Sequence, residues 1–584
     1  MPAQLLQWAP TNTETAEEYE QRKKRLYEEI VRCEISDTVA VNKLKKFLLA
    51  EGIAGIAELD YPLRMRYAAF LEKNVKQGKR HLNAFDRVKQ YAIQQQMKTL
   101  AGRQACKWQY QNQILFIPYH SDEEVVKQFA AARQMETMVW DFGVDCSEQL
   151  KRQVFEVLNH IIADNRDDVT RRVTLLALQR FYGFCVENKI ADIEKLELDE
   201  VEKFYMEIRR EKKSGVERFT GILNYSRKIV FVNAAEIHWD AGVWYLERLH
   251  LTAERANQST LRNTVSFLEI RNKENRRYAQ AYMKYELGVT GQAVSTICRK
   301  YQFIQAFLTT MEEKNLEAVR CKAEDIDIHI KRLQALKIQE KGFNERISAI
   351  QHFYKFLEIK GYIKQVPFHA AYYYQKVLPV HHDRSVEDAV WKEVIQKLRF
   401  FPEHLRCMFL HLWCLGLRAS EVCTLKGDAY FRQSGEAWMK IHQVKMKNYK
   451  RIPIPEALYK VMQVYLEKHH IKPEDYIFQN SRGGACLYNT FRTQMLKCCK
   501  ENEIENGHYM FQSHDYRHTV ATLFYDSEVS IQSIRDYLGH NYEEMTRQYI
   551  DYMPKRLAKA NDEYFSKPNH SLAACLKKGD SFGK

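Results

Sequence analysis

The scarcity of residues that interrupt helices constrains the fold of this chain most. Only 22 of its 584 residues are glycine and 12 are proline. Because these two residues most strongly end helices, long stretches should be helical and the loops fairly short. A chain of this length also exceeds the size at which a single hydrophobic core stops growing. We therefore expect several domains that are mainly α-helical, with small β-sheet elements.

Helical patterning and its interruptions divide the chain into predicted segments. Residues 1–106 should form an N-terminal helical module. Residues 107–255 should form a second, mostly helical module with β-hairpin elements. The β elements are expected at "KWQYQNQILFIPY" (107–119), which is rich in aromatic and β-branched residues, and at "IVFVNAAEIHWDAGVWYLERL" (229–249), around an Asp-Ala-Gly turn.

The rest of the chain separates into a helical module, a second domain and a tail. Residues 256–378 should form a helical module, in which "NERISAIQHFYKFLEIKGYI" carries apolar residues at helical spacing. A linker that contains Pro367 and Pro379 should follow. After it, "VEDAVWKEVIQKL" should begin a further domain over 384–566. Residues 567–584 have the composition of a mobile tail.

Three stretches suggest an internal repeat. They are "KKFLLAEGIAGIAELDYPLRMRY", "YGFCVENKIADIEKLELDEVEKFY" and "QAFLTTMEEKNLEAVRCKAEDIDIHI". Each has an aromatic-led helix end, a short break and an acidic helix start, at a spacing of roughly 125 to 140 residues. Any two helices joined by a turn share some of these features, so both interpretations stay open at this stage.

Charge and cysteine usage narrow the class of protein. The chain has 89 Lys and Arg against 75 Asp and Glu, which favours a nucleic-acid partner without requiring one. Its 13 cysteines include no C-x-x-C pair, so we expect reduced thiols rather than disulfides or a zinc site. The first residues lack a signal-peptide pattern, and no apolar run is long enough to span a bilayer. These features predict a cytoplasmic protein, associated with the nucleoid when bound to DNA.

Polar residues suited to an anionic substrate gather in the C-terminal 170 residues. Arg418 follows an apolar helix and a Leu-Gly-Leu break. "MKIHQVKMKNYKRIPIP" predicts a hairpin with a basic turn. His514 and Arg517 are three residues apart, so on a helix they would share a face. His540 lies at a glycine-marked helix break, and Tyr549 follows nine residues later, on what should be a following helix. Each feature alone is common.

In combination, their order and spacing resemble the tyrosine recombinase (phage integrase) family. "GLRASEV", "HDYRHTVAT" and "YLGHNYEEMTRQYI" are similar to the three motifs of that family, and the resemblance covers roughly residues 386–564. It extends more loosely to 256–378, which is similar to the family's helical core-binding (SAM-like) DNA-binding domain. The total length resembles the larger recombinases of site-specific bacterial transposons. The resemblance therefore implies an α+β tyrosine-recombinase catalytic domain over 384–566, with additional helical modules before it.

The resemblance implies an enzyme that cleaves and rejoins DNA through a covalent 3′-phosphotyrosine intermediate, without a metal or other cofactor. Arginines suit the phosphate because guanidinium stays protonated and offers paired donors. The implied catalytic residues are Arg418, Lys445, His514, Arg517, His540 and Tyr549.

Several assignments within that set stay open. Tyr549 would be the nucleophile and His514 its base. Lys445 would be the general acid, with Lys447 as an alternative. Tyr552 and Tyr542 are rival nucleophiles. Glu421 resembles an acidic residue common in the first motif, with an orienting or structural role.

Partners follow from the same resemblance. They are double-stranded DNA at recombination sites, further copies of the chain in a synaptic homo-tetramer, and other recombinases of the same mobile element. One alternative keeps the chemistry without synapsis, as in type IB topoisomerases or telomere resolvases. Another is a catalytically silent DNA-binding accessory protein of a mobile element. The sequence leaves open the target DNA sequence, the preference for integration or excision, and the role of residues 1–255.

Overall fold

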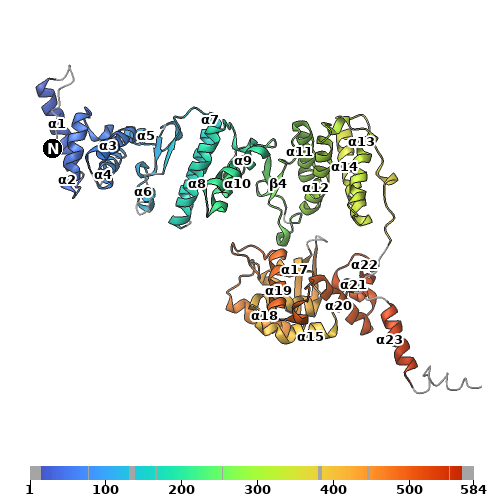
Figure 1. Ribbon diagram of the computed structural model, residues 1–584. Helices are drawn as coiled ribbons and strands as arrows, with labels where there is room; N and C mark the ends of the chain where they lie inside the picture. The colour runs from blue at the N-terminus through green and yellow to red at the C-terminus, as the bar shows by residue number, and fades with distance from the viewer. Residues whose placement is uncertain are drawn as a thin grey trace, which may run out of the picture. The chain divides into compact units, whose positions relative to one another are not determined.

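The chain is described here from a computed structural model (Figure 1). The structure describes residues 15–75, 78–112, 114–129, 138–164, 167–252, 254–378, 384–443, 448–550 and 553–567. The chain divides into two compact units, Met1–Arg248 and Leu249–Lys584, and each is described by itself. Helices dominate both units, as predicted, and the strands are short.

The first unit is built from helices with short strands between them. Its helices are α1 (Ala16–Val31), α2 (Thr38–Ala50), α3 (Tyr61–Asn74), α4 (Gly78–Gln96), α5 (Leu100–Ala105), α6 (Glu123–Phe129), α7 (Glu148–Ala163), α8 (Asp168–Glu187), α9 (Leu198–Glu211) and α10 (Val216–Asn233). Its strands are β1 (Ile114–Phe116), β2 (Val139–Asp141) and β3 (Val243–Tyr245). β1 and β2 pair in antiparallel fashion, with Leu115 opposite Trp140.

The β elements predicted for this unit are shorter than the sequence suggests. Among the described residues of 107–119, Ile114–Phe116 alone form a strand, and 3-10 turns lie on both sides of it in the sequence. The prediction of a strand at "IVFVN" is wrong, because these residues form the last turn of α10. Ile229 and Val230 continue the buried stripe of that helix, and this packing outweighs their β preference.

The second unit contains a helical module followed by a mixed domain. The module holds β4 (Thr264–Ser266), α11 (Lys273–Gly288), α12 (Val294–Glu312), α13 (Ala323–Ala335) and α14 (Glu340–Ile359). The apolar stripe predicted in α14 is confirmed, since Ile347, Ile350 and Phe353 are fully buried.

The C-terminal domain combines helices with one small sheet. Its helices are α15 (Asp388–Lys397), α16 (Glu403–Leu415), α17 (Ala419–Cys423), α18 (Glu456–Lys468), α19 (Tyr488–Glu501), α20 (Ser513–Asp526), α21 (Ile531–Leu538), α22 (Glu543–Arg547) and α23 (Met553–Phe565). Its strands are β5 (Tyr430–Gln433), β6 (Glu436–Gln443) and β7 (Asn448–Pro453), in the antiparallel order β5-β6-β7. The predicted hairpin is confirmed as β6 and β7, where Gln443 pairs with Asn448.

A large hydrophobic core holds most of this domain together, and a smaller cluster, formed by Ala521, Ile534, Leu538 and Ile550, lies beside it. α16 lies in it with Met408, Phe409, Leu412 and Leu415 buried, and the inner face of β6 contributes Met439 and Ile441. α20 packs against α16, which fixes the polar residues of α20 relative to the end of α16. Across the described ranges, none of the helices has the length and apolar character of a membrane-spanning segment. The predicted tail lies almost wholly outside those ranges.

Candidate active site

Left-handed glycines at two helix ends set the polar residues in place. α16 is capped by Gly416, whose φ is 59°, and Arg418 is the N-cap of α17. α21 ends at Gly539, whose φ is 69°, and His540 follows it. Such glycine caps turn the chain sharply because a residue without Cβ adopts positive φ at little cost. The helix breaks predicted at both positions are therefore confirmed.

Arg517 is the most strongly anchored residue of the site. Its side chain is fully buried on α20. Its Nη1 donates to the Gly416 carbonyl at 2.8 Å, and its Nη2 donates to the Leu538 carbonyl at 2.6 Å. Burial, followed by the charge of Arg418, lowers the pKa of Arg517 to about 10. The guanidinium therefore stays charged near neutral pH, and both glycine-capped helix ends hold it in place.

His540 is held in its neutral form. Its Nε2 lies 2.8 Å from Nη2 of Arg517, which can only donate, so Nε2 accepts. Nδ1 lies 2.9 Å from the Thr546 hydroxyl and carries the ring proton in this arrangement. Burial and the charges of Arg517, Arg418 and Lys450 lower the pKa of His540 to about 2. The imidazole therefore orients Arg517 without adding charge.

Tyr549 and His514 face each other across the site. The Tyr549 hydroxyl lies 2.8 Å from His514 Nε2. Partial burial and the charges of His518, Arg517, Arg384 and Arg418 lower the pKa of His514 to about 4, although the residue remains exposed. A neutral imidazole at this distance can accept the phenolic proton. Tyr549 does not lie on a helix as expected, but in the turn after α22.

Aromatic and cationic groups surround the Tyr549 ring. The ring of His540 stacks on it at 4.8 Å between centroids, and that of His518 lies at 4.5 Å. The guanidinium of Arg517 lies over the same ring at 5.4 Å. His518 was not predicted from the sequence, although its position one residue after Arg517 could have suggested it. These contacts hold the phenol in one place.

Arg418 is positioned by Glu421, as the sequence suggested for this carboxylate. Arg418 Nη1 donates to Glu421 Oε1 at 2.8 Å, and the side chain of Glu421 is only 2% exposed. Gln443 of β6 donates from Nε2 to the same oxygen at 3.1 Å. Burial alone would raise the pKa of Glu421, but the charges of Lys450, Arg517 and Arg418 outweigh it, and the pKa is lowered. The carboxylate is thus a buried counter-ion shared by three cations.

Lys450 is a second residue that sequence reasoning missed. It lies on β7, and its Nζ donates to the carbonyls of Tyr537 and Leu538 at 3.1 and 3.4 Å. Burial lowers the pKa of Lys450 to about 8, although Glu421 opposes the shift. In sequence it is one of several lysines in a basic turn, and only the fold places it beneath the site.

The remaining predicted residues are not all described. Lys445, its alternative Lys447 and the rival nucleophile Tyr552 lie outside the described residues. Tyr542 is described, and 67% of its surface is exposed. Of the six predicted catalytic residues, Arg418, His514, Arg517, His540 and Tyr549 lie in one connected network. Across the described ranges, no group of three or more His, Cys, Asp and Glu side chains could hold a metal ion.

A substitution at Gly539 tests the geometry of this network. A Cβ at this position would lie 2.2 Å from Nε2 of the buried Gln443, in addition to the cost of positive φ. We expect Gly539→Ala to lower the free energy of unfolding of this domain by about 3 kcal/mol. Gly435→Ala is the control, because φ is +85° there but nothing lies within 4 Å of the added Cβ. Thermal unfolding should show a clearly smaller shift for the control, and equal shifts would contradict the close approach.

These groups together form a cationic site suited to an anion, with a phenol beside it. Two guanidinium groups converge, and Nε of Arg517 is buried without a hydrogen-bond partner among the described residues. A buried donor of this kind requires an acceptor, and a phosphate oxygen would supply one. The sequence pattern of the phage integrase family matches residues 387–556, which span every described residue of this network. Residues 387–556 form a phage integrase domain.

The chain is also similar to several known proteins. Transposase B from transposon Tn554 of Staphylococcus aureus is 26% identical over 330 residues, which is 55% of this chain and 52% of that protein. The chain thus spans about half the length of this relative. Tyrosine recombinase XerC of Oceanobacillus iheyensis is 24% identical over 294 residues, covering 48% of this chain and 92% of that protein. Among solved structures, the integrase of transposon Tn1549 in complex with circular intermediate DNA is 14% identical, covers 49% of this chain and 97% of that one, and has a TM-score of 0.35.

The buried amine beneath the phage integrase domain's arginines predicts a pH dependence. The pKa of Lys450 is about 8, so its positive charge is present below that pH and is lost above it. If this charge helps to hold an anion, the rate of any cleavage by this site should fall as pH rises through about 8. Lys450→Arg should remove that fall because guanidinium does not deprotonate in this range. The ratio of the two rates, measured from pH 6 to 10, isolates Lys450 from other titrating groups, and a constant ratio would contradict its participation.

Proposed function

We propose that this chain is a site-specific DNA recombinase that cleaves and rejoins DNA through a covalent 3′-phosphotyrosine intermediate. One observation carries the proposal. The Tyr549 hydroxyl lies 2.8 Å from a neutral imidazole, and the ring of the same tyrosine lies beneath the anchored guanidinium of Arg517. A nucleophile, its base and a phosphate-binding cation are thus within one site.

The proposed cleavage step is an in-line displacement at phosphorus. Oη of Tyr549 forms the new bond, and its proton passes to Nε2 of His514. The bond from phosphorus to the 5′-oxygen breaks, which leaves a 3′-phosphotyrosine and a free 5′-hydroxyl. Arg517 and Arg418 would bind the non-bridging oxygens, where negative charge builds in the transition state. His540 and Glu421 would act indirectly, by orienting Arg517 and Arg418.

The leaving 5′-oxygen needs a proton. We assign this role to Lys445 of the β6–β7 hairpin, with Lys447 as the alternative. The hairpin is described up to Gln443 and from Asn448 onward, so both lysines lie outside the described residues. Rejoining would reverse both proton transfers, and no external energy source is required because the phosphotyrosine bond retains the energy of the phosphodiester.

The proposal extends to partners and organisation. The substrate would be duplex DNA at the ends of a mobile element, and the element would be integrated or excised. The helical module over 256–378 would be the core-binding domain, followed by the catalytic domain over 384–566, with recombination in a homo-tetramer. The names of the relatives support this assignment, since they include a transposase and a recombinase. A catalytically silent accessory protein is disfavoured because the described site retains its nucleophile, base and both arginines.

The covalent intermediate is the direct test. We would incubate the full chain with nicked duplexes taken from DNA flanking its gene, because a nick near the cleavage point lets the short product diffuse away and traps the adduct. A denaturing gel would separate protein joined to DNA, and mass spectrometry after proteolysis would locate the attached nucleotide.

The outcomes distinguish the proposals. A nucleotide on the peptide that contains Tyr549 would support the function and the nucleophile together. A nucleotide on Tyr552 would keep the reaction and replace the nucleophile. Binding of the same duplexes without any adduct would favour the accessory-protein alternative.

A further inference from the structure

The same order of elements occurs three times before the C-terminal domain. Each copy has a helix, a second helix, a one-turn 3-10 helix, a third helix and a fourth helix. The copies are α1 to α4 with a 3-10 turn at Ile56–Glu58, α7 to α10 with one at Ile193–Lys195, and α11 to α14 with one at Ala318–Arg320. In each copy the second helix packs most extensively against the fourth.

The turn after the second helix has the same geometry in every copy. A residue with positive φ ends the helix, and it is Gly52, Lys189 or Asn315. The next N–H then donates to a carbonyl five residues back, which is the long bond of a Schellman motif. These bonds run from Ile53 to Leu48 (3.1 Å), Ile190 to Cys185 (2.8 Å) and Leu316 to Met311 (3.1 Å).

A side chain of the first helix closes each copy in the same way. Its oxygen accepts the N–H of the first residue of the 3-10 turn, although it comes from different points along the helix. The pairs are Glu29 with Ile56 (2.9 Å), Gln153 with Ile193 (2.9 Å) and Asn275 with Ala318 (2.7 Å). One such bond could occur by coincidence. Because the turn after the second helix and this side-chain bond both recur in all three copies, the copies represent one repeated module.

The repeated modules differ in charge. The segment 256–378 contains 20 Lys and Arg against 12 Asp and Glu, and the segment 1–106 contains 18 against 13. The middle segment, 107–255, contains 21 against 25. Within the copies themselves the difference is smaller: 16 Lys and Arg against 12 Asp and Glu over 16–96, 16 against 15 over 148–233, and 15 against 11 over 273–359. The first and third copies thus carry the larger excess of positive charge, as expected for contact with a polyanion.

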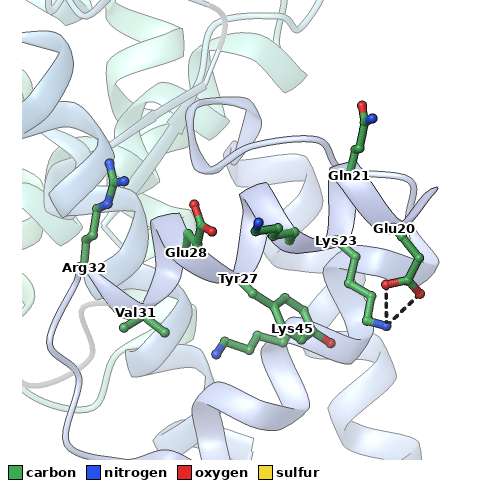
Figure 2. A pocket seen from close by; sticks show the side chains of 9 residues that line it. Glu20, Gln21, Lys23, Tyr27, Glu28, Val31, Arg32 and Lys45 are labelled. Carbon is green, nitrogen blue, oxygen red and sulfur yellow. Dashed lines mark hydrogen bonds and ion pairs between the residues drawn. The ribbon is translucent and has the colours of Figure 1, made fainter. Parts of the chain in front are cut away.

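The first copy gathers part of this charge around an open hollow of about 820 Å³ on α1 and α2 (Figure 2). Lys23 and Lys24 of α1, and Arg32 directly after that helix, line the hollow. Lys45 of α2 lies with its ammonium 4.8 Å from the ring centroid of Tyr27. Lys23 is paired with Glu20 at 2.9 Å.

The charge in this hollow is only partly balanced. Four cations line it together with two carboxylates, Glu20 and Glu28. Lys24 and Arg32 are exposed, and their side chains form no ion pair with any described residue. Cations spread along an open surface over an aromatic ring suit a phosphate backbone better than a small enclosed ligand.

We infer that the first copy is a second DNA-binding module, which holds the backbone of duplex DNA through the hollow on α1 and α2, apart from the DNA held by 256–378. The inference rests on the proposed function for its ligand. The second copy, whose charges nearly balance, would join the two DNA-binding modules without binding DNA itself. This assignment gives the N-terminal region a defined role in lengthening the contact with DNA.

The test compares two charge-matched pairs of substitutions in the full chain. Lys24→Gln with Arg32→Gln removes two cations from the hollow of the first copy. Arg209→Gln with Arg210→Gln removes two exposed cations from α9 of the second copy and is the control. We would measure the association constant for a long duplex of random sequence as a function of salt concentration. Each lost phosphate contact reduces the slope of log K against log salt by about 0.9.

We expect the first pair to reduce the slope by about 2 and the control pair to leave it unchanged. Covalent adduct formation on the nicked duplex is measured in parallel, and both pairs should retain it because all four residues lie outside the catalytic domain. Equal slopes for both pairs, whether reduced or not, would overturn the inference. If the unmodified chain forms no adduct, the proposed function is contradicted. A slope change confined to the first pair would, even then, support DNA binding by this module.

Discussion

Tyr549→Phe is expected to abolish covalent adduct formation on nicked DNA. The substitution removes one oxygen, the atom that lies 2.8 Å from His514 Nε2, and leaves the ring that stacks against His540 and His518. The fold and non-covalent DNA binding should therefore be retained. We expect the rate of adduct formation to fall by about four orders of magnitude or more, because no other group can replace a covalent nucleophile.

Tyr542→Phe is the matched control, since the same atom is removed from a tyrosine that is 67% exposed. Its adduct yield on a denaturing gel should equal that of the unmodified chain. Undiminished adducts with Tyr549→Phe would disprove the proposed nucleophile and direct attention to Tyr552.

Arg517→Lys is expected to give the second largest loss. Lysine keeps the charge but cannot reproduce a fork that donates simultaneously to the carbonyls of Gly416 and Leu538 while contacting His540. The lysine ammonium would donate either to the two carbonyls or to the phosphate, but not to both in the geometry of the guanidinium. We expect the cleavage rate to fall about a thousandfold, the loss typical of removing a fixed transition-state donor.

Single-turnover cleavage measures this effect, and binding at equilibrium is followed separately. Arg482→Lys, at an exposed position of the same domain, should leave the rate unchanged. A change in affinity with no change in the single-turnover rate would mean that Arg517 only recruits DNA.

The sequence predicted the parts of the site that motif spacing encodes. His514 and Arg517 share the first turns of one helix, and glycine marks the breaks before Arg418 and His540, so local rules suffice for them. That Tyr549 would contact His514 followed from the family resemblance and not from any local rule. The assignment of its following helix was wrong, because α22 is only five residues long and ends before Tyr549.

Residues that act through long-range packing could not be predicted in this way. Lys450 and Gln443 are strand residues that donate to carbonyls at the end of α21. Lys450 donates to Tyr537, 87 positions away, and Gln443 donates to Leu538, 95 positions away. Nothing in a basic hairpin distinguishes a buried lysine from its solvated neighbours. In the same way, "IVFVN" has β-branched residues that suit a strand, and only packing within the module makes it the end of α10. The three-fold repeat was suggested by pattern, but it is the shared turn and the shared side-chain bond that distinguish it from ordinary pairs of helices.

The carbonyl of Leu538 receives donors from three separate segments, namely Arg517 of α20, Lys450 of β7 and, at 3.5 Å, Gln443 of β6. α21 has only eight residues, and short helices fray readily. The stability of α21 and the affinity of Arg517 for an anion are consequently coupled. By thermodynamic linkage, each affects the other to the same extent. An anion that fixes Arg517 should slow amide hydrogen exchange in α21, and a change that frays α21, even at its distant first turn, should weaken the hold on the anion. Hydrogen exchange in this short helix would thus report whether the site is occupied, without any chemistry taking place.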